Sequence, residues 1–160
     1  MNKILFVCTG NMCRSPMAEV ILREKWKMLG RNDLFVSSTG IYAHKNHPAA
    51  KHAIEVCREN EIDLSNHRTR PVEPKELIAA DLIFTMEKVQ KEYLNLFFPA
   101  VNDRVFMLGA AWNGPEKKKN NIPDPMGGAL KDFRKSFKAV DSHIERILPY
   151  LQERFVQREQ

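Results

Sequence analysis

The sequence predicts an α/β protein in which a four-stranded parallel sheet carries helices on both faces. Short apolar segments at residues 3–7, 34–38, 82–86 and 104–108 have the length and composition of buried strands. Amphipathic stretches separate them, and strands that alternate with helices form parallel sheets covered on both sides. The chain has 160 residues, the size of one domain, so we expect residues 1–160 to fold as a single unit.

The first strand, residues 3–7, is expected to lead through a short turn into the first helix. Ser15 followed by Pro16 is typical of a helix start, with Ser15 as the N-cap and Pro16 at the first helical position. The apolar residues that follow fall on one helical stripe: Ala18, Leu22, Trp26 and Leu29. A strand, a tight loop and a helix therefore follow one another directly.

Two further helices are expected between the later strands. His47 and Pro48 indicate the start of the second helix, and residues 87–97 form the helix between the third and fourth strands. The apolar face of the second helix is expected to contain Ala50, Ala53, Ile54 and Cys57. Cys57 is thus predicted to lie in the core.

The C-terminal part of the chain predicts a long surface loop and a long helix. Residues 112–128 are rich in proline, asparagine and lysine, which is typical of a loop. The last helix runs from about residue 129 to residue 155, and we expect Pro149 to kink or end it near Leu148. Its apolar stripe is explained by packing on the sheet, with dimerisation through a helical seam as the alternative.

Composition and cysteine usage exclude several classes of protein. The net charge of +5 favours an anionic partner but does not indicate nucleic acid, and no apolar run approaches the roughly 18 residues of a membrane span. The N-terminus lacks the pattern of a signal peptide, so we expect a cytoplasmic protein. The three cysteines contain no Cys-x-x-Cys pair and the five histidines are scattered, so we expect no metal and no cofactor.

The loop of residues 8–15 carries the chemistry. Ligands of parallel sheets bind beyond the carboxyl ends of the strands, and the start of a helix offers unpaired N–H groups to an anion. Gly10, and to a lesser degree Asn11, tolerate the left-handed backbone that turns successive N–H groups inward. Arg14 adds a planar fork of donors that suits two oxygens of a phosphate. The sequence therefore predicts a site for a tetrahedral oxyanion.

Cys8 stands at the first position of this loop, where its sulfur can lie under the bound anion. The field that binds phosphate also favours a thiolate, and a thiolate below a phosphorus atom is an in-line nucleophile. Ser15 can donate its hydroxyl to that sulfur. Asp124, between Pro123 and Pro125 in the long loop, is the best candidate for the acid that protonates a leaving oxygen. A nucleotide-binding Walker loop is excluded because its Gly-Lys-Ser/Thr ending is absent.

With these residues the sequence resembles the low-molecular-weight protein tyrosine phosphatase family. Residues 7–19, Val-Cys-Thr-Gly-Asn-Met-Cys-Arg-Ser-Pro-Met-Ala-Glu, fit the family's N-terminal signature almost throughout. The resemblance extends over nearly the whole chain, through residues 38–40, 67–70, 80–86 and the Asp-Pro pair at residues 124–125.

The resemblance implies a metal-free phosphatase with a cysteinyl-phosphate intermediate. Cys8 would be the nucleophile, Arg14 the phosphate clamp and Asp124 the general acid and then the base. The phosphate-binding loop would comprise Cys8, Thr9, Gly10, Asn11, Met12, Cys13, Arg14 and Ser15. A supporting network would include Asn11, Ser15, Thr39 and His67. Cys13 could form a reversible disulfide with Cys8 that protects the nucleophile.

The family implies a phosphorylated protein or peptide as substrate, inorganic phosphate as product, and a monomeric enzyme. Phosphotyrosine is the expected phosphoresidue, although the segment after Asp124 lacks the aromatic residues that the family often carries there. Met12 and Met126 would be pocket walls, and Tyr42 or His44 would supply the remaining wall. Met12 stands where a branched aliphatic residue is commoner, and a methionine wall can adapt its shape.

Three alternatives remain. The protein-arginine phosphatase branch resembles this chain in Cys-Thr-Gly-Asn, in Arg-Ser-Pro-Met-Ala-Glu and in Asp-Pro-x-Gly-Gly, but it favours threonine where this chain has Met12. A thioredoxin-coupled arsenate reductase would need further cysteines, and none follows Cys57. A phosphate-binding module without turnover would typically have lost the nucleophile, the arginine or the acid.

Overall fold

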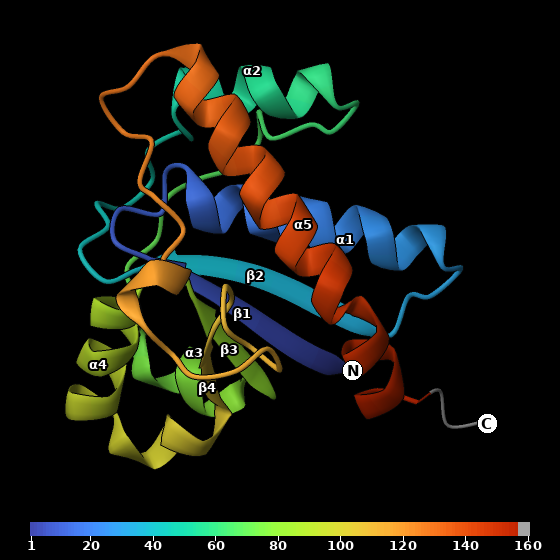
Figure 1. Ribbon diagram of the computed structural model, residues 1–160, viewed down its shortest axis with the longest axis vertical. Helices are drawn as coiled ribbons and strands as arrows, with labels where there is room; N and C mark the ends of the chain where they lie inside the picture. The colour runs from blue at the N-terminus through green and yellow to red at the C-terminus, as the bar shows by residue number, and fades with distance from the viewer. Residues whose placement is uncertain (157–160) are drawn as a thin grey trace.

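The centre of the molecule is a parallel sheet with the strand order β2-β1-β3-β4, seen in the computed structural model of Figure 1. The structure describes residues 1–156. The strands are β1 (Asn2–Cys8), β2 (Leu34–Gly40), β3 (Leu82–Thr85) and β4 (Val105–Met107). All neighbouring pairs are parallel, so the fold class predicted from the sequence is confirmed.

The register of the central strands brings their carboxyl ends to one edge of the sheet. Val7 pairs with Thr39 of β2 and with Thr85 of β3, while Cys8 pairs with Gly40. The loop after β1 therefore begins between the ends of its two neighbouring strands. Any group that follows Thr85 or Gly40 is placed beside that loop.

The two faces of the sheet are buried under different helices. Side chains of β1 alternate, so that Ile4 and Phe6 join one core cluster and Leu5 and Val7 join another. The first cluster lies under α1 (Arg14–Met28) and α5 (Leu130–Arg154), and α2 (Lys51–Glu59) packs against α5. The second lies under α3 (Pro74–Ala79), α4 (Lys88–Phe97) and the 3-10 helix η1 (Pro99–Arg104).

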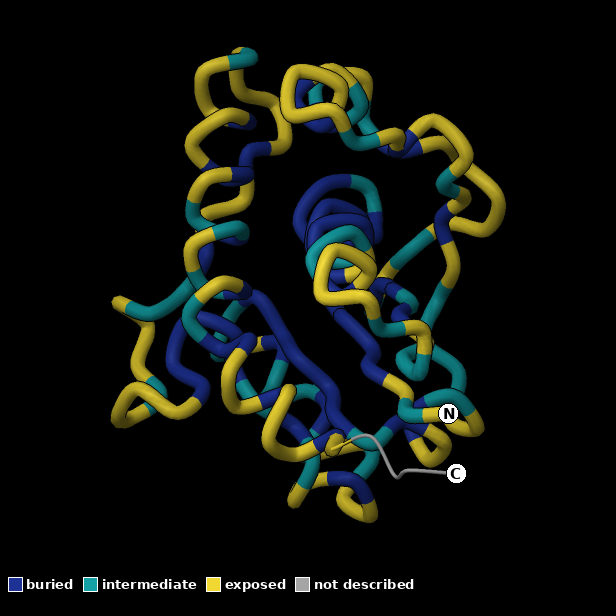
Figure 2. Tube along the Cα trace, turned by 90° about the vertical axis from the view of Figure 1, so that its right-hand side faces the viewer, coloured by how far each residue is buried: buried dark blue, intermediate teal, exposed yellow. Residues whose placement is uncertain are grey.

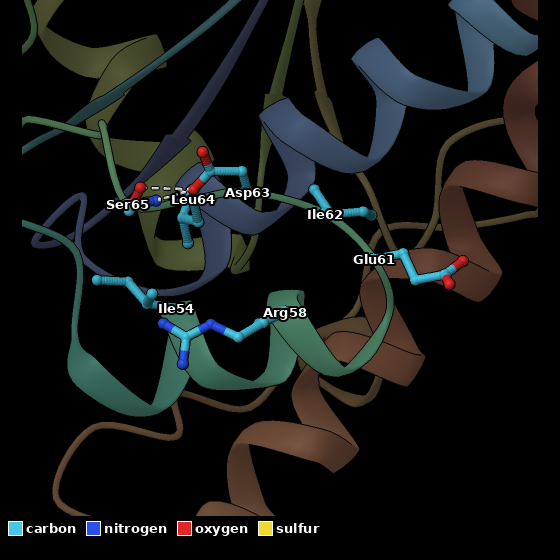
Figure 3. Close-up of a pocket in the computed structure, with 7 residues that line it drawn as sticks. All are labelled: Ile54, Arg58, Glu61, Ile62, Asp63, Leu64 and Ser65. Carbon is cyan, nitrogen blue, oxygen red and sulfur yellow. Dashed lines mark hydrogen bonds between the residues drawn. The ribbon is translucent and has the colours of Figure 1, made fainter.

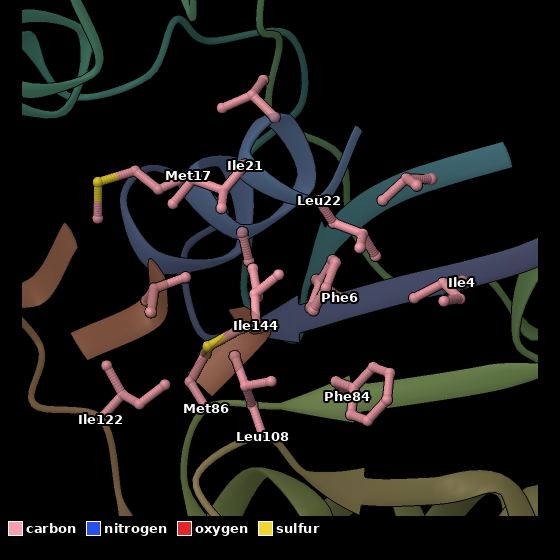
Figure 4. Close-up of a cluster of buried hydrophobic side chains, with 14 of the residues drawn as sticks. Ile4, Phe6, Met17, Ile21, Leu22, Phe84, Met86, Leu108, Ile122 and Ile144 are labelled. Carbon is pink, nitrogen blue, oxygen red and sulfur yellow. The ribbon is translucent and has the colours of Figure 1, made fainter. Parts of the chain in front are cut away.

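The first cluster is the larger one and links helices to strands across the sheet. Figure 4 shows Phe6 and Phe84 on the sheet, with Ile21 of α1 and Ile144 of α5 turned toward them. In Figure 2 the strands are buried along most of their length, whereas the outer faces of the helices are exposed. The sheet edge that carries the loop after Cys8 is thus held by a rigid core on both sides.

The first helix starts two residues earlier than predicted. It begins at Arg14, and the Ser15 hydroxyl does not cap it because that hydroxyl is bonded to the loop instead. The helix ends at Met28, so Leu29 lies beyond the apolar stripe and is exposed. Ala18, Leu22 and Trp26 are buried as predicted.

The second helix starts later than predicted and a third was not predicted. The helix α2 begins at Lys51 because the N–H groups of His47 and Ala50 donate to the Thr69 hydroxyl and to the Met12 carbonyl oxygen. Cys57 is fully buried on this helix, as predicted. The helix α3 has only six residues, too few to show a helical period in the sequence.

The last helix has the predicted extent, and Pro149 does not end it, which was one of the two effects expected of that proline. The helix α5 continues to Arg154, since Leu148 and Leu151 on either side of the proline are buried in the first cluster.

The long loop of residues 112–128 is ordered. It contains the 3-10 helix η2 (Lys118–Asn120), and its buried Ile122 donates its N–H to the Met86 carbonyl oxygen. Within residues 1–156, no helix combines the length and the apolar character that crossing a membrane requires.

Candidate active site

The loop between β1 and α1 wraps around the sulfur of Cys8. The side chain is buried, and its Sγ lies 2.9 Å from the Ser15 hydroxyl. The Asn11 N–H also donates to this sulfur, at 3.3 Å. The sulfur thus lies next to the N-terminal end of α1, where the Asn11 N–H donates to it and the Ser15 hydroxyl is in contact with it.

Asn11 holds the loop in its shape. Its φ is +56°, in the left-handed region, and its side chain is fully buried. The side-chain N–H₂ group donates to the hydroxyls of Ser15 (2.9 Å) and Ser38 (3.0 Å), and the side-chain oxygen accepts the Arg70 N–H (3.0 Å). The Asn11 carbonyl oxygen is bonded to His67 Nε2 at 2.8 Å. These bonds offset the cost of a left-handed residue, about 1–2 kcal/mol.

The structure differs from the sequence-based account of this support at two positions. Gly10 does not have a positive φ, so Asn11 supplies the left-handed turn. The Thr39 hydroxyl has no hydrogen-bond partner within the described residues; Thr39 contributes its carbonyl oxygen, which accepts from Ser15 at 3.3 Å. The side chain that contacts Asn11 is that of Ser38, which the sequence analysis did not single out.

Gly40 allows the loop to approach β2 closely. A Cβ at this position would lie 2.7 Å from the Thr9 carbonyl oxygen and 2.8 Å from the Asn11 nitrogen. Real Cβ atoms are essentially never that close to backbone atoms. The strand pairing of Cys8 with Gly40 therefore requires a glycine where the loop begins.

Arg14 is buried among acceptors that fix its guanidinium. Nη1 donates to the Ile122 carbonyl oxygen at 2.7 Å and lies 3.3 Å from a carboxylate oxygen of Glu87, while Nη2 lies 3.5 Å from Asp124. The Arg14 side chain is 2% exposed, against 45% for that of Asp124. A buried guanidinium with fixed orientation can bind two oxygens of a tetrahedral anion.

Glu87 and Gln90 connect this arginine to the rest of the loop, and the sequence analysis missed both. The side-chain oxygen of buried Gln90 accepts the N–H groups of Met86 and Glu87, each at 2.9 Å. Its side-chain nitrogen donates to the Thr9 hydroxyl at 3.1 Å and to the Glu87 carboxylate at 3.2 Å. Polar residues three apart just after a strand are typical of a capping box, and this pattern could have identified the pair.

The loop and the acid meet at one cavity of about 170 Å³. Its lining residues are Cys8, Thr9, Gly10, Met12, Cys13, Arg14, Asp124 and Met126. Asn11 and Ser15 of the loop, and His67 that supports it, are not among these lining residues. The structure thus brings the thiol, the guanidinium and the carboxyl group together around a space that can hold a small anion.

Only two of the residues predicted to form the walls of the pocket line the cavity. Met12 and Met126 line it, whereas Tyr42 and His44 are exposed and do not. The Tyr42 N–H donates to the Thr9 carbonyl oxygen at 2.9 Å, so the Tyr42 backbone lies beside the loop that lines the cavity. Met126 Sδ accepts from the Cys13 thiol at 3.0 Å.

Cys13 is a buried thiol in this structure. Burial, together with Asp124 and Cys8 nearby, raises the pKa of Cys13 to about 12. Cys8 and Cys13 are both free cysteines here. The redox role of the pair stays a prediction.

A second hollow, of about 320 Å³, lies at the end of α2 (Figure 3). Its lining consists of Ile54, Arg58, Glu61, Ile62, Asp63, Leu64 and Ser65, none of which lines the cavity at Cys8. Asp63 accepts hydrogen bonds from the N–H and the hydroxyl of Ser65, which makes a local turn.

Residues 1–156 contain no group of three or more His, Cys, Asp or Glu side chains arranged to hold a metal ion.

His67 makes the stability of the protein depend on pH. Burial lowers the pKa of His67 below its ordinary value of 6.5, and its contact with the Asn11 carbonyl oxygen requires a donor. Because the unfolded chain then binds more protons than the folded one as the pH falls through about 6.5, stability is lost toward acid pH. We expect His67→Gln, which keeps a donor but cannot titrate, to lose less stability between pH 7 and pH 5. Urea unfolding at both pH values measures this, and equal losses would contradict it.

Comparisons with known proteins agree with this geometry. Residues 3–159 match the family model described as "Low molecular weight phosphotyrosine protein phosphatase". The chain is 34% identical over 146 residues to a probable low molecular weight protein-tyrosine-phosphatase, EpsP, of Ralstonia nicotianae, covering 91% of this chain and 93% of that one. It is 32% identical over 148 residues to a protein-arginine-phosphatase of Bacillus subtilis, covering 92% and 95%.

A solved structure supports the same assignment. The crystal structure of a low molecular weight protein tyrosine phosphatase from T. tengcongensis is similar with a TM-score of 0.86 and 34% identity, covering 94% of this chain and 99% of that one. The match of sequence and fold extends over almost the entire chain. The chain therefore belongs to the family of low molecular weight phosphotyrosine protein phosphatases.

Proposed function

We propose that this enzyme hydrolyses phosphotyrosine in proteins through a phosphocysteine formed on Cys8. The observation that carries the proposal is that Cys8, Arg14 and Asp124 line one cavity of about 170 Å³. The family membership supports the reaction class. The residue roles come from the geometry and from the chemistry of each group.

In the first step the Cys8 thiolate attacks phosphorus and the bond to the tyrosine oxygen breaks. Arg14 binds two of the phosphoryl oxygens, and the loop N–H groups stabilise the charge that builds up on them. Asp124 donates its proton to the leaving phenolate oxygen. The products of this step are the free tyrosine side chain and the phosphocysteine.

In the second step water releases inorganic phosphate. Asp124, now ionised, accepts a proton from the attacking water, and the bond between phosphorus and sulfur breaks. The Ser15 hydroxyl, 2.9 Å from Sγ, stabilises the departing thiolate. The enzyme returns to its starting state, so the cycle needs neither a metal nor a redox partner.

One feature of the cavity favours the arginine-phosphatase alternative, namely the absence of an aromatic wall, whereas Met12 departs from the threonine of that branch. None of the described lining residues is aromatic, and thioethers of Met12 and Met126 stand where a phenyl ring would be flanked. A flexible methionine can pack on either a ring or a guanidinium stem. Phosphoarginine is therefore the second candidate substrate on the same catalytic residues.

We further propose that the enzyme acts as a monomer in the cytoplasm on phosphorylated proteins or peptides. The nucleophile must stay reduced, and Cys8, Cys13 and Cys57 are all free thiols in the structure. Disulfides are rare in the cytosol, where thiols are kept reduced.

The substrate preference can be measured with two peptides that differ only in carrying phosphotyrosine or phosphoarginine. We expect kcat/KM to be at least about tenfold higher for phosphotyrosine, because a tenfold ratio needs only about 1.4 kcal/mol of differential binding. Cys8→Ser serves as the blank, since it lacks the nucleophile. A preference for phosphoarginine would replace the proposed substrate and keep the mechanism.

Replacement of Asp124 should depend on the leaving group. In Asp124→Asn we expect kcat/KM, which reports the steps up to the phosphocysteine, to fall by about 10²–10³-fold for an aryl phosphate with a basic leaving phenolate, and by much less for a weakly basic one. The reason is that a weakly basic phenolate leaves without being protonated. Asp103→Asn, at an exposed carboxylate in η1, is the matched control. Equal losses across the leaving-group series would show that another group is the acid.

A further inference from the structure

Apolar side chains of α4, together with Tyr42 beside it, form a row that the catalytic account does not use; its middle member, Tyr93, is half-buried and its two ends are exposed. Tyr42, Tyr93 and Phe97 make up this aromatic row: their rings are 5.9 Å apart between Tyr42 and Tyr93 and 4.7 Å apart between Tyr93 and Phe97. Tyr42 and Phe97 are 70% and 59% exposed. Val89 and Leu96, also exposed, lie on the same helical face as Tyr93 and Phe97. Single exposed apolar residues are ordinary, but a contiguous row indicates a contact surface.

The row begins at the mouth of the catalytic cavity. The Tyr42 N–H donates to the Thr9 carbonyl oxygen at 2.9 Å, and Thr9 lines the cavity. Gln90, one turn before Tyr93 on α4, donates to the Thr9 hydroxyl at 3.1 Å. In Figure 1 α4 lies on the side of the molecule to which the carboxyl end of β1 points. When a substrate chain inserts its phosphorylated side chain into the cavity, the residues on one side of that side chain can therefore lie against this row.

The charges around α4 favour an apolar partner over a strongly acidic one. Lys91 has its ammonium 2.5 Å from the Glu116 carboxylate, and Lys88 has its ammonium 3.8 Å from that of Glu92. These cations are thus partly neutralised by the protein itself. The surface that the row offers to a partner therefore consists of aromatic rings and aliphatic side chains.

We propose that the aromatic row binds an apolar side chain of the substrate protein, in the extended segment that flanks the phosphorylated residue. This inference rests on the proposed phosphatase function and names a part of its substrate recognition. The centroid distances of 5.9 Å and 4.7 Å limit the length of the row from Tyr42 to Phe97 to about 11 Å, which an extended chain covers in about three residues at roughly 3.3 Å per residue. Because Tyr42 follows the loop that lines the cavity, the contact is with a leucine-like or aromatic side chain within about three positions of the phosphoresidue.

The test compares two phosphopeptides and one small substrate. One peptide has serine at all flanking positions, the other has leucine three residues from the phosphoresidue on each side, and the small substrate is phenyl phosphate. For the unchanged enzyme we expect the leucine peptide to have a KM about five- to tenfold lower at equal kcat, the effect of partly burying one leucine.

The decisive variant is Phe97→Ser, at the exposed end of the row and outside the catalytic cavity. We expect it to abolish the difference in KM between the peptides while kcat/KM for phenyl phosphate stays within about twofold. The matched control is Met28→Ser, which removes an 84% exposed apolar side chain at the last residue of α1 and should keep the difference. The split between KM for peptides and activity on phenyl phosphate separates docking from a change in folding or chemistry.

Each contrary outcome has a distinct meaning. Turnover of phenyl phosphate without discrimination between the peptides overturns the docking proposal alone, as does discrimination that survives in Phe97→Ser. If the unchanged enzyme turns over none of the three substrates, the proposed function fails. The row is then tested directly by comparing the affinities of the leucine and serine peptides for Cys8→Ser, measured by fluorescence anisotropy. Sedimentation that shows a dimer lost in Phe97→Ser, with unaltered peptide discrimination, assigns the row to a second copy and overturns the proposal.

Discussion

The buried side chain of Asn11 is the constraint on which the site depends. A non-glycine residue at φ +56° persists only when its surroundings hold it, and here four hydrogen bonds do so from the neighbouring strand end, helix and loops. A buried polar group left without its partner costs about 1–3 kcal/mol, so partial loss of this network favours a different loop. The network turns the Asn11 N–H toward the Cys8 sulfur and leaves the loop open toward the cavity.

An ion pair also links the loop to α4, because Arg14 at the end of the loop contacts Glu87 at the start of that helix. Arg14 is a buried cation, and burial is tolerable because Glu87, Asp124 and the Ile122 carbonyl oxygen lie within reach of its guanidinium. Glu87 is in turn held by Gln90, which also donates to Thr9. The arginine is thus oriented before any anion arrives, and the ordering cost of binding is reduced. Asp124 is more exposed than Arg14, which agrees with the proton-exchanging role that we propose for it.

Sequence reasoning reached the elements whose signals are local. The spacing from Cys8 to Arg14-Ser15-Pro16 predicted the loop between β1 and α1, and the four apolar segments predicted the sheet. The contribution of Ser38 in place of the Thr39 hydroxyl was not accessible, because it depends on the register between β1 and β2 and both residues are small and polar. Glu87 and Gln90 approach Arg14 and Thr9 only through the pairing of β1 with β3. The persistence of α5 beyond Pro149 follows from burial of Leu151, a tertiary effect that overrides a local signal.

Binding of inorganic phosphate to Cys8→Ser and to the double variant Cys8→Ser/Asn11→Ala, by titration calorimetry, tests the central claim most directly. The absence of the nucleophile removes turnover from both measurements, so only the shape of the loop differs. If Asn11 holds the anion site open, the double variant binds phosphate at least about tenfold more weakly, equivalent to about 1.4 kcal/mol, with the protein still folded. Equal phosphate affinity in the two proteins would show that the loop keeps its shape without Asn11 and would contradict the account.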